Sequence, residues 1–372
     1  MKSKTILTAA VLVTAQLALF APTAEAGGGC ANSVTWPSVS PVWEFCFRAP
    51  NNSTPAGNGS GLEIYDVKWK GTTILKTAHI PILNVRYAPN GCFGDPCYRD
   101  WFDENRRFDC APSSGGICTG TSTPASTVCN NPGSDSGSFS GVAVEDFGTS
   151  LRLTAQTAAG WYRYIPWYEF YADGRIEARA SFTAVDHPCE IEDHNHHAYW
   201  RFDFDINETA DNWVDEVVGV TPTRVATEKS WVDTSPARSQ WIVGSNSSGL
   251  TVEVTRNAGD QGAGDPLLVP NDFPMADGWV LAYKSNELTD FNGFSTNPSV
   301  CRANLDDFDT NESVNGTDIV LWVHAGSFHE SQPGGDNMRC TDAGPTLRVI
   351  EGPMLVDGFE TGDTSRWTSE TQ

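Results

Sequence analysis

Residues 194–205 read HNHHAYWRFDFD, a run of strand length in which three histidines precede alternating aromatic and charged side chains. On a β-strand, successive side chains point to opposite faces. His194 and His196 therefore share one face, and His197 shares the other face with Arg201 and the two aspartates that follow. The segment predicts a strand that carries an imidazole pair on one face and carboxylates on the other.

The same period-two pattern recurs along most of the chain and predicts an all-β protein. Strand-length stretches rich in Val, Ile, Tyr, Phe and Trp alternate with Gly, Asn, Asp and Pro, and no stretch longer than ten residues has a convincing helical period. Thirteen Trp and eighteen Phe suit the core of a large antiparallel β-sandwich. The stretches are GLEIYDVKWKG (61–71), SLRLTAQTA (150–158), YEFYADGRIEARASF (168–182), YWRFDFDI (199–206), SQWIVGS (239–245), GLTVEVTR (249–256), GWVLAYKS (278–285), DIVLWVHAG (318–326) and TLRVIEG (346–352).

The N-terminus has the features of a secretory signal. Lys2 and Lys4 precede an apolar run, and AEA ends at residue 26 with small residues that suit cleavage. We expect a signal peptide over 1–26, a flexible segment over 27–42, one β-sandwich domain over 43–355 and a polar tail over 356–372. No later segment is apolar for long enough to form a membrane helix, so we expect a soluble, secreted or periplasmic mature chain.

Charge and cysteine content narrow the possible partners. The chain has a formal net charge of −23, which argues against a nucleic-acid partner. Its ten cysteines all lie outside the signal, and an even number in an exported protein predicts up to five disulfides.

The paired histidines are a candidate metal site. His194 and His196 can share one ion if a third ligand comes from elsewhere, and either His324 or His329, in another strand-like segment, could supply it. Asp203 and Asp205 offer hard oxygen ligands for a second cation such as Ca²⁺. The alternative for both groups is a solvated, polar end of a strand.

With these motifs in place, the sequence resembles the copper amine oxidases, whose topaquinone cofactor is made from one of their own tyrosines. The family's copper motif is H-x-H with Arg five residues on and Asp two further, as in His194, His196, Arg201 and Asp203. The tyrosine motif resembles GWYRYIPWYEFYADGRIE (160–177), which places the cofactor precursor at Tyr162.

The resemblance also assigns the remaining site residues. It selects His329 as the third copper ligand, three residues after a glycine, and implies Asp103 as the catalytic base and Tyr87 as a cofactor-contacting tyrosine. His197 and His324 are then structural or surface residues. The second-cation ligands implied are Asp203, Asp205 and Asp318, with the carbonyls of Phe204 and Ile319. Cys110 and Cys129 bracket the region where the family has an intradomain disulfide.

The activity implied is the oxidation of primary amines by O₂, which gives an aldehyde, ammonia and hydrogen peroxide. The resemblance also implies the supersandwich fold of the family's catalytic domain, without the usual N-terminal domains, and a homodimer. Trp161 and Arg163 depart from the family's residues on either side of the tyrosine. Two alternatives stay open: a catalytically degenerate copper-binding homologue, which these departures favour, and a carbohydrate-binding β-sandwich stabilised by Ca²⁺, which the many aromatic residues permit.

Overall fold

The computed structural model describes most of the chain between residues 30 and 352. Asp103, Cys110 and Trp161, together with the expected signal peptide and C-terminal tail, lie outside the described residues. The described residues are 30, 32–54, 61–88, 97–99, 117–119, 127–130, 142–159, 162–184, 192–233, 240–263, 276–287, 305–330 and 340–352.

The described elements are almost all strands, as the alternating sequence predicts. One sheet contains β1 (Ser33–Trp36), β2 (Trp43–Arg48), β3 (Glu63–Trp69), β4 (Thr72–Tyr87), β5 (Cys97–Arg99), β12 (His194–Phe204), β15 (Lys229–Trp231), β18 (Gly278–Ala282) and β20 (Ile319–His329). The other contains β6 (Ile117–Thr119), β7 (Val142–Asp146), β8 (Ser150–Thr154), β9 (Thr157–Ala159), β10 (Tyr162–Tyr171), β11 (Arg175–Ala184), β13 (Asn212–Val218), β14 (Thr221–Arg224), β16 (Gln240–Ser245), β17 (Leu250–Thr255), β19 (Asn315–Thr317), β21 (Thr341–Ala343) and β22 (Thr346–Glu351). Short 3₁₀ turns occur at η1 (Pro50–Asn52), η2 (Val128–Asn130) and η5 (Leu305–Phe308).

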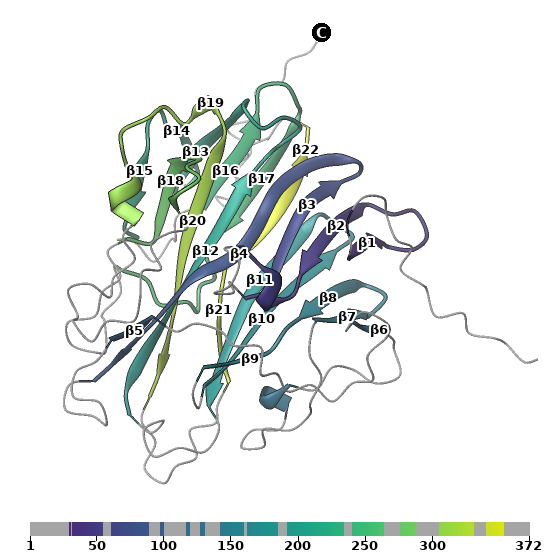
Figure 1. Ribbon diagram of the computed structural model, residues 1–372. Helices are drawn as coiled ribbons and strands as arrows, with labels where there is room; N and C mark the ends of the chain where they lie inside the picture. The colour runs from purple at the N-terminus through teal and green to yellow at the C-terminus, as the bar shows by residue number, and fades with distance from the viewer. Residues whose placement is uncertain are drawn as a thin grey trace, which may run out of the picture.

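The two sheets stack face to face as a large β-sandwich, which confirms the predicted fold class (Figure 1). Within the described residues, the nine-stranded sheet has the order β1-β2-β3-β4-β12-β20-β18-β15, with β5 on β4. The thirteen-stranded sheet has the order β14-β13-β16-β17-β22-β11-β10-β8-β7-β6, with β19, β21 and β9 on β13, β11 and β10. Each stretch with period-two alternation contains a strand, and the ADG sequence forms the β10–β11 turn, where Gly174 has a φ of +91°. No helix among the described residues is long and apolar enough to cross a membrane.

Aromatic side chains from the inner faces join the sheets. Phe45 stacks on Phe170 at 4.1 Å between ring centroids, and Tyr168 meets Trp200 edge-on at 5.6 Å. The indole of Trp43 also donates a hydrogen bond across the sandwich to the carbonyl of Tyr171, at 2.7 Å. A smaller apolar cluster covers the outer face of the nine-stranded sheet, and its members are Ile82, Tyr199, Ala276, Trp279, Leu281, Leu305, Val320 and Trp322.

The longest strand, β4, has no counterpart among the predicted stretches. It lies between β3 and β12, and its register with β12 shifts between Arg201, opposite His79, and Tyr199, opposite Ile82. Pro81 lies in this irregular part of the strand. Because proline cannot donate a backbone hydrogen bond, strands accept it at bulges.

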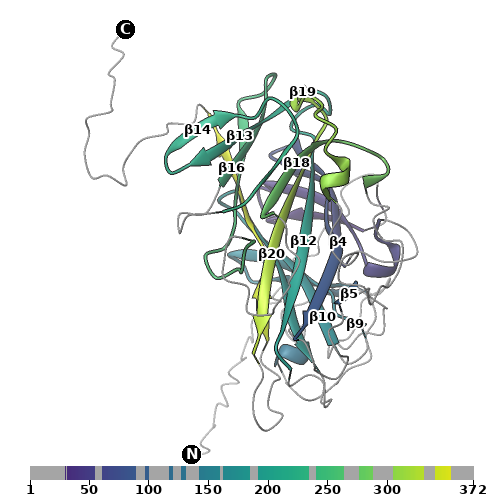
Figure 2. The same cartoon turned by 90° about the vertical axis from the view of Figure 1, so that its left-hand side faces the viewer.

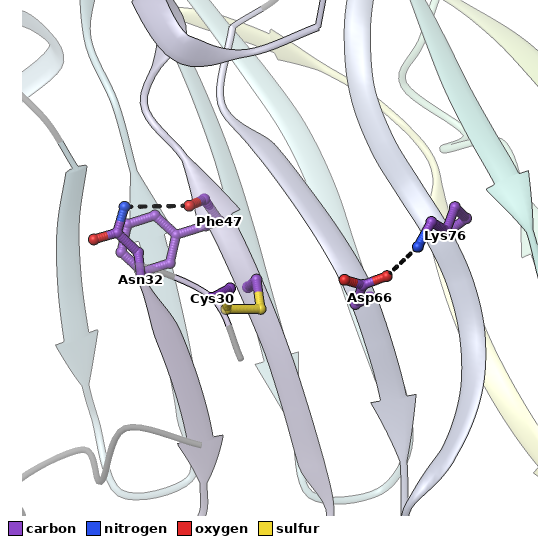
Figure 3. The surroundings of a disulfide bond; sticks show 6 residues. Cys30, Asn32, Phe47, Asp66 and Lys76 are labelled. Carbon is purple, nitrogen blue, oxygen red and sulfur yellow. Dashed lines mark hydrogen bonds and ion pairs between the residues drawn. A yellow bond between two sulfur atoms is a disulfide. The ribbon is translucent and has the colours of Figure 1, made fainter. Parts of the chain in front are cut away.

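Disulfides fasten two peripheral segments. Residues Ser33–Trp36, within the segment expected to be flexible, form β1 on the edge of the sheet, where Cys30 is bonded to Cys46. Figure 3 shows this bond beside the hydrogen bond from Asn32 to the carbonyl of Phe47. Cys129 is bonded to Cys340, which joins η2 to the segment just before β21.

The contact between Phe45 and Phe170 gives a direct test of the sandwich core. Replacing Phe170 with alanine removes a fully buried ring and leaves a cavity between the sheets. We expect the free energy of unfolding to fall by about 3–5 kcal/mol, measured by denaturant titration. Val39→Ala is the control, because Val39 is 81% exposed and its truncation should leave stability within about 0.5 kcal/mol of the parent. A small loss in the Phe170 variant would contradict the packing.

Candidate active site

Three strands of the nine-stranded sheet bring the predicted site residues to one end of the sandwich. On β12, His194 lies between Tyr87 of β4 and His329 of β20 as their direct cross-strand partner. Figures 1 and 2 both show the start of β12, the end of β20 and the start of β10 at this same end. The antiparallel register therefore unites residues that are more than a hundred positions apart in sequence.

The three histidines converge on the inner face of the sheet. Ligand nitrogens of His194, His196 and His329 lie within 4.8 Å of one another. Their ring centroids are 4.9 Å (His194–His196), 4.8 Å (His194–His329) and 6.2 Å (His196–His329) apart. All three side chains are buried. The alternation along the strand predicted that His194 and His196 share a face, and the resemblance selected His329 as the third ligand.

The hydrogen bonds decide which nitrogens face the centre of the triad. His194 Nδ1 donates to the carbonyl of Glu192, which leaves Nε2 to point at the Tyr162 hydroxyl. His329 presents Nδ1, which lies 3.5 Å from the same hydroxyl. Both ring nitrogens of the fully buried His196 lack a hydrogen-bond partner in the described structure. A buried imidazole with no partner carries a desolvation cost that a bound cation would offset, so the triad fits a metal ion.

Burial keeps His194 and His196 in the neutral form that binds metals. It lowers the pKa of His194 to about 3, with a further contribution from the charge of His329. Burial likewise moves the pKa of His196 well below its ordinary value, and the neighbouring histidines lower it further. Neutral imidazoles are the ligand form, and they suit transition metals such as Cu²⁺ and Zn²⁺.

Tyr162 reaches the triad from the opposite sheet. It begins β10, is 1% exposed, and its ring lies 4.8 Å from the ring of His196 and 5.3 Å from that of His194. Tyr87 stacks on the other side of His194, at 4.9 Å and 28°. The structure thus places a phenol, a second tyrosine and three imidazoles together. Asp103, the base implied by the resemblance, lies outside the described residues.

A second cluster lies at the far end of β12, on the outer face of the sheet. Carboxylate oxygens of Asp203, Asp205 and Asp318 lie within 4.8 Å of one another. Phe204 and Ile319, whose carbonyls the resemblance implies as ligands, are cross-strand partners beside this cluster. One oxygen each of Asp205 and Asp318 is buried and has no hydrogen-bond partner in the described structure.

Burial raises the pKa of all three carboxylates, and the charge of neighbouring carboxylates raises it further at Asp205 and Asp318. Burial and the charges of Asp203 and Asp205 raise the pKa of Asp318 to about 7. Burial also raises the pKa of Asp203, although the Arg201 guanidinium, 3.1 Å away, opposes this shift. Crowded carboxylates that resist ionisation suit a divalent cation with oxygen ligands, such as Ca²⁺.

Two residues that the sequence reasoning missed complete these clusters. Phe182 on β11 stacks flat on His196, at 4.8 Å and 8°. Glu287 accepts a hydrogen bond from Arg201 Nε at 2.8 Å. Phe182 lies opposite Tyr164 in the β10–β11 hairpin. The turn predicted from the ADG sequence sets the register of this hairpin, and that register determines where Phe182 lies. Glu287 follows β18 in a loop, and no sequence pattern signals it.

Comparisons with known proteins agree with this architecture. A copper-containing benzylamine oxidase from Hansenula polymorpha is 16% identical and has a TM-score of 0.62, covering 93% of this chain and 63% of that one. Pichia pastoris lysyl oxidase is 14% identical with a TM-score of 0.56, covering 83% of this chain and 51% of that one. Aspergillus nidulans amine oxidase is 16% identical with a TM-score of 0.55, covering 92% and 55%. No protein-family model matches the sequence, and no curated protein matches it.

The chain therefore has the fold of a copper amine oxidase catalytic domain. It spans 63% of the length of the benzylamine oxidase and just over half of the other two chains. At these identities the likeness establishes the fold, and the chemistry depends on the residues in the site.

The acidic cluster predicts a pH-dependent response to Ca²⁺. Because the folded pKa of Asp318, about 7, exceeds its ordinary 3.8, its contribution to stability without a cation is full below about pH 4 and is lost as the pH rises through 7. Ca²⁺ binds the ionised carboxylates, so we expect it to raise Tm more at pH 8 than at pH 5, as measured by calorimetry against a chelator.

A control distinguishes a Ca²⁺ response of this cluster from a response of other carboxylates. Asp318→Asn should abolish the Ca²⁺-dependent rise in Tm, whereas Asp173→Asn, in the exposed β10–β11 turn, should keep it. Equal Ca²⁺ responses in the two variants would rule out a cation at the cluster.

Proposed function

We propose that this protein is an exported, copper- and topaquinone-dependent oxidase of primary amines. The observation that carries the proposal is the position of the Tyr162 hydroxyl, which contacts His194 Nε2 and lies 3.5 Å from His329 Nδ1. This position puts an oxidisable phenol beside the imidazoles that would hold the metal.

The proposed roles follow from the geometry of each side chain. His194 would bind copper through Nε2 and His329 through Nδ1, and His196 would complete the set. Phe182, on one face of His196, restricts the plane of that ring. The carbonyl of Glu192 fixes the tautomer of His194, in the way that hydrogen bonds commonly orient ligand histidines. His194 and His196 are thus oriented before the ion binds.

The chemistry requires a redox ion beside the phenol. Bound copper would allow O₂ to oxidise the Tyr162 ring to the quinone, an electron sink for primary amines. The resemblance implies that Tyr87, whose ring stacks on His194, contacts the cofactor. Asp103 is the proposed base that removes the proton from the α-carbon of the amine. The products would be an aldehyde, ammonia and hydrogen peroxide.

The proposal also covers where the protein is located and whether it forms a homodimer. The N-terminal signal features and the disulfides Cys30–Cys46 and Cys129–Cys340 support export to an oxidising compartment. The homodimer rests on the resemblance, and light scattering of the purified chain would test it. The domain limit at residue 355 stays a prediction that limited proteolysis would test, whereas β1 and the Cys30–Cys46 bond extend the domain upstream of the expected limit at residue 43.

Quinone formation tests the proposal directly. The mature chain, prepared without copper, is mixed with Cu²⁺ in air and followed by visible absorption and redox-cycling stain. We expect a visible band to form in the parent and not in Tyr162→Phe. Substrate amines should then consume O₂ and release hydrogen peroxide.

Tyr168→Phe is the matched control. Tyr168 is also a buried tyrosine on the inner face of β10, but it packs against Trp200 and its hydroxyl has no hydrogen-bond partner in the described structure. Its loss should leave the band unchanged. A copper-loaded but colourless parent would favour the degenerate copper-binding alternative, a result that Trp161 and Arg163 would explain. A parent that binds no copper would favour the Ca²⁺-stabilised carbohydrate-binding sandwich.

A further inference from the structure

Two histidines that the proposed copper site does not use form a buried pair on the opposite face of the same strands. His197 of β12 and His324 of β20 are fully buried, and their Nδ1 and Nε2 atoms are 2.9 Å apart. Their rings lie nearly parallel, at 5.1 Å and 27°. The pair is diagonal across the sheet, because His197 is opposite Gly326 and His324 is opposite Tyr199. It therefore links the strand of His196 directly to the strand of His329.

A carboxylate and an arginine extend this pair. His324 Nδ1 lies 3.7 Å from Asp277 Oδ1, too long for a hydrogen bond but close enough for strong electrostatic contact at this buried position. The same oxygen of Asp277 is 2.9 Å from the Arg256 guanidinium. Two further bonds hold the backbone of His324: its amide donates to the Asp277 carbonyl at 3.0 Å, and its carbonyl accepts from Arg256 Nε at 3.1 Å.

The segment that supplies Arg256 also docks on β20 just before the third ligand. Gln261 and Gly326 exchange two backbone hydrogen bonds, of 2.8 and 2.9 Å. A Cβ atom at Gly326 would lie 2.8 Å from the carbonyl oxygen of Gln261, so no larger residue fits without a shift. These hydrogen bonds thus hold β20 at residues 324–326, three to five positions before His329.

The charges assign the proton between the two rings. The carboxylate of Asp277 favours a proton on His324 Nδ1, because a lone pair facing the carboxylate would be repelled. His324 Nε2 is then the acceptor and His197 Nδ1 the donor. Burial lowers the pKa of His324 to about 4, although Asp277 opposes this shift, so His324 is neutral at pH 7. The link is therefore a directed hydrogen bond from His197 Nδ1 to His324 Nε2.

We propose that His324 is a positioning residue, whose hydrogen bond with His197 holds β12 and β20 in the alignment that brings His196 and His329 onto one copper ion. This inference rests on the proposed copper site. Metal geometry requires ligand atoms to be held within about 0.5 Å. The backbone ladder sets the register of the two strands. The imidazole bond adds a side-chain link on the outer face, one residue from His196 and five residues from His329, so its loss changes the metal site without removing a ligand.

Copper spectroscopy of three variants tests this role. The copper-free chain is loaded with one equivalent of Cu²⁺, and copper affinity and the EPR hyperfine splitting are measured beside Tm. His324→Phe removes the acceptor, so we expect the splitting to change and the affinity to fall by about tenfold, as when a residue that orients a metal ligand is lost. His324→Gln offers an amide oxygen in place of Nε2 and should restore most of both values.

Leu281→Ala is the control for a loss of stability alone. Leu281 of β18 is fully buried in the apolar cluster on the outer face of the nine-stranded sheet. Its truncation should lower Tm while the copper spectrum stays that of the parent. A parental spectrum and affinity in His324→Phe, with only a lower Tm, would show that the pair merely stabilises the fold and would overturn the proposal. So would a second equivalent of copper that binds the parent and not His324→Phe, because the pair would then be a metal site. The EPR signal does not require quinone formation, so these outcomes are independent of whether the chain oxidises amines.

Discussion

The antiparallel register of β12 and β20 is the constraint on which the candidate site depends. It places His194 opposite His329, and the period-two geometry of the strand places His196 on the same face. A slip of one residue would turn every side chain of one strand to the other face. The aromatic side chains that follow the histidines prevent this slip, because Trp200 and Phe202 belong to the inner core while Tyr199 belongs to the outer one. Core packing therefore fixes the position of residues whose own chemistry is polar.

One strand serves both candidate metal sites because its two faces and two ends meet different surroundings. At its start, the inner face offers imidazoles that burial keeps neutral, which suits a transition metal. At its end, the outer face offers crowded carboxylates beside Arg201, which suit a hard cation. Arg201 contacts Asp203 and so offsets part of the negative charge of the cluster, whereas Glu287, its other partner, adds to that charge. The two sites can bind different ions because the nitrogen ligands lie on the inner face at the start of β12, whereas the oxygen ligands lie on the outer face at its end.

Much of this organisation could be predicted from the sequence, because the alternation of side chains along one strand determines which of them share a face. The all-β class, the faces of β12 and the placement of His194 and His196 on one of these faces follow from a period of two. β4 was not predicted because Pro81 interrupts its alternating pattern. It forms a strand because it pairs with β12 on one side and with β3 on the other. The His197–His324 bond could not be predicted either: it depends on a diagonal across two strands distant in sequence, and on Asp277 and Arg256 at the ends of other strands. His324, interpreted from the sequence as a structural or surface residue, is wholly enclosed.

Tyr162 belongs to one sheet and all three histidines to the other. The distance between phenol and imidazoles is therefore a property of the interlayer packing, and no single strand determines it. Relative movement of the two layers, such as thermal breathing of the sandwich, would separate the oxidisable ring from its ion while every ligand stayed in place. The rate of cofactor maturation should in this way report on the rigidity of the whole scaffold, including residues that touch neither the ion nor the ring.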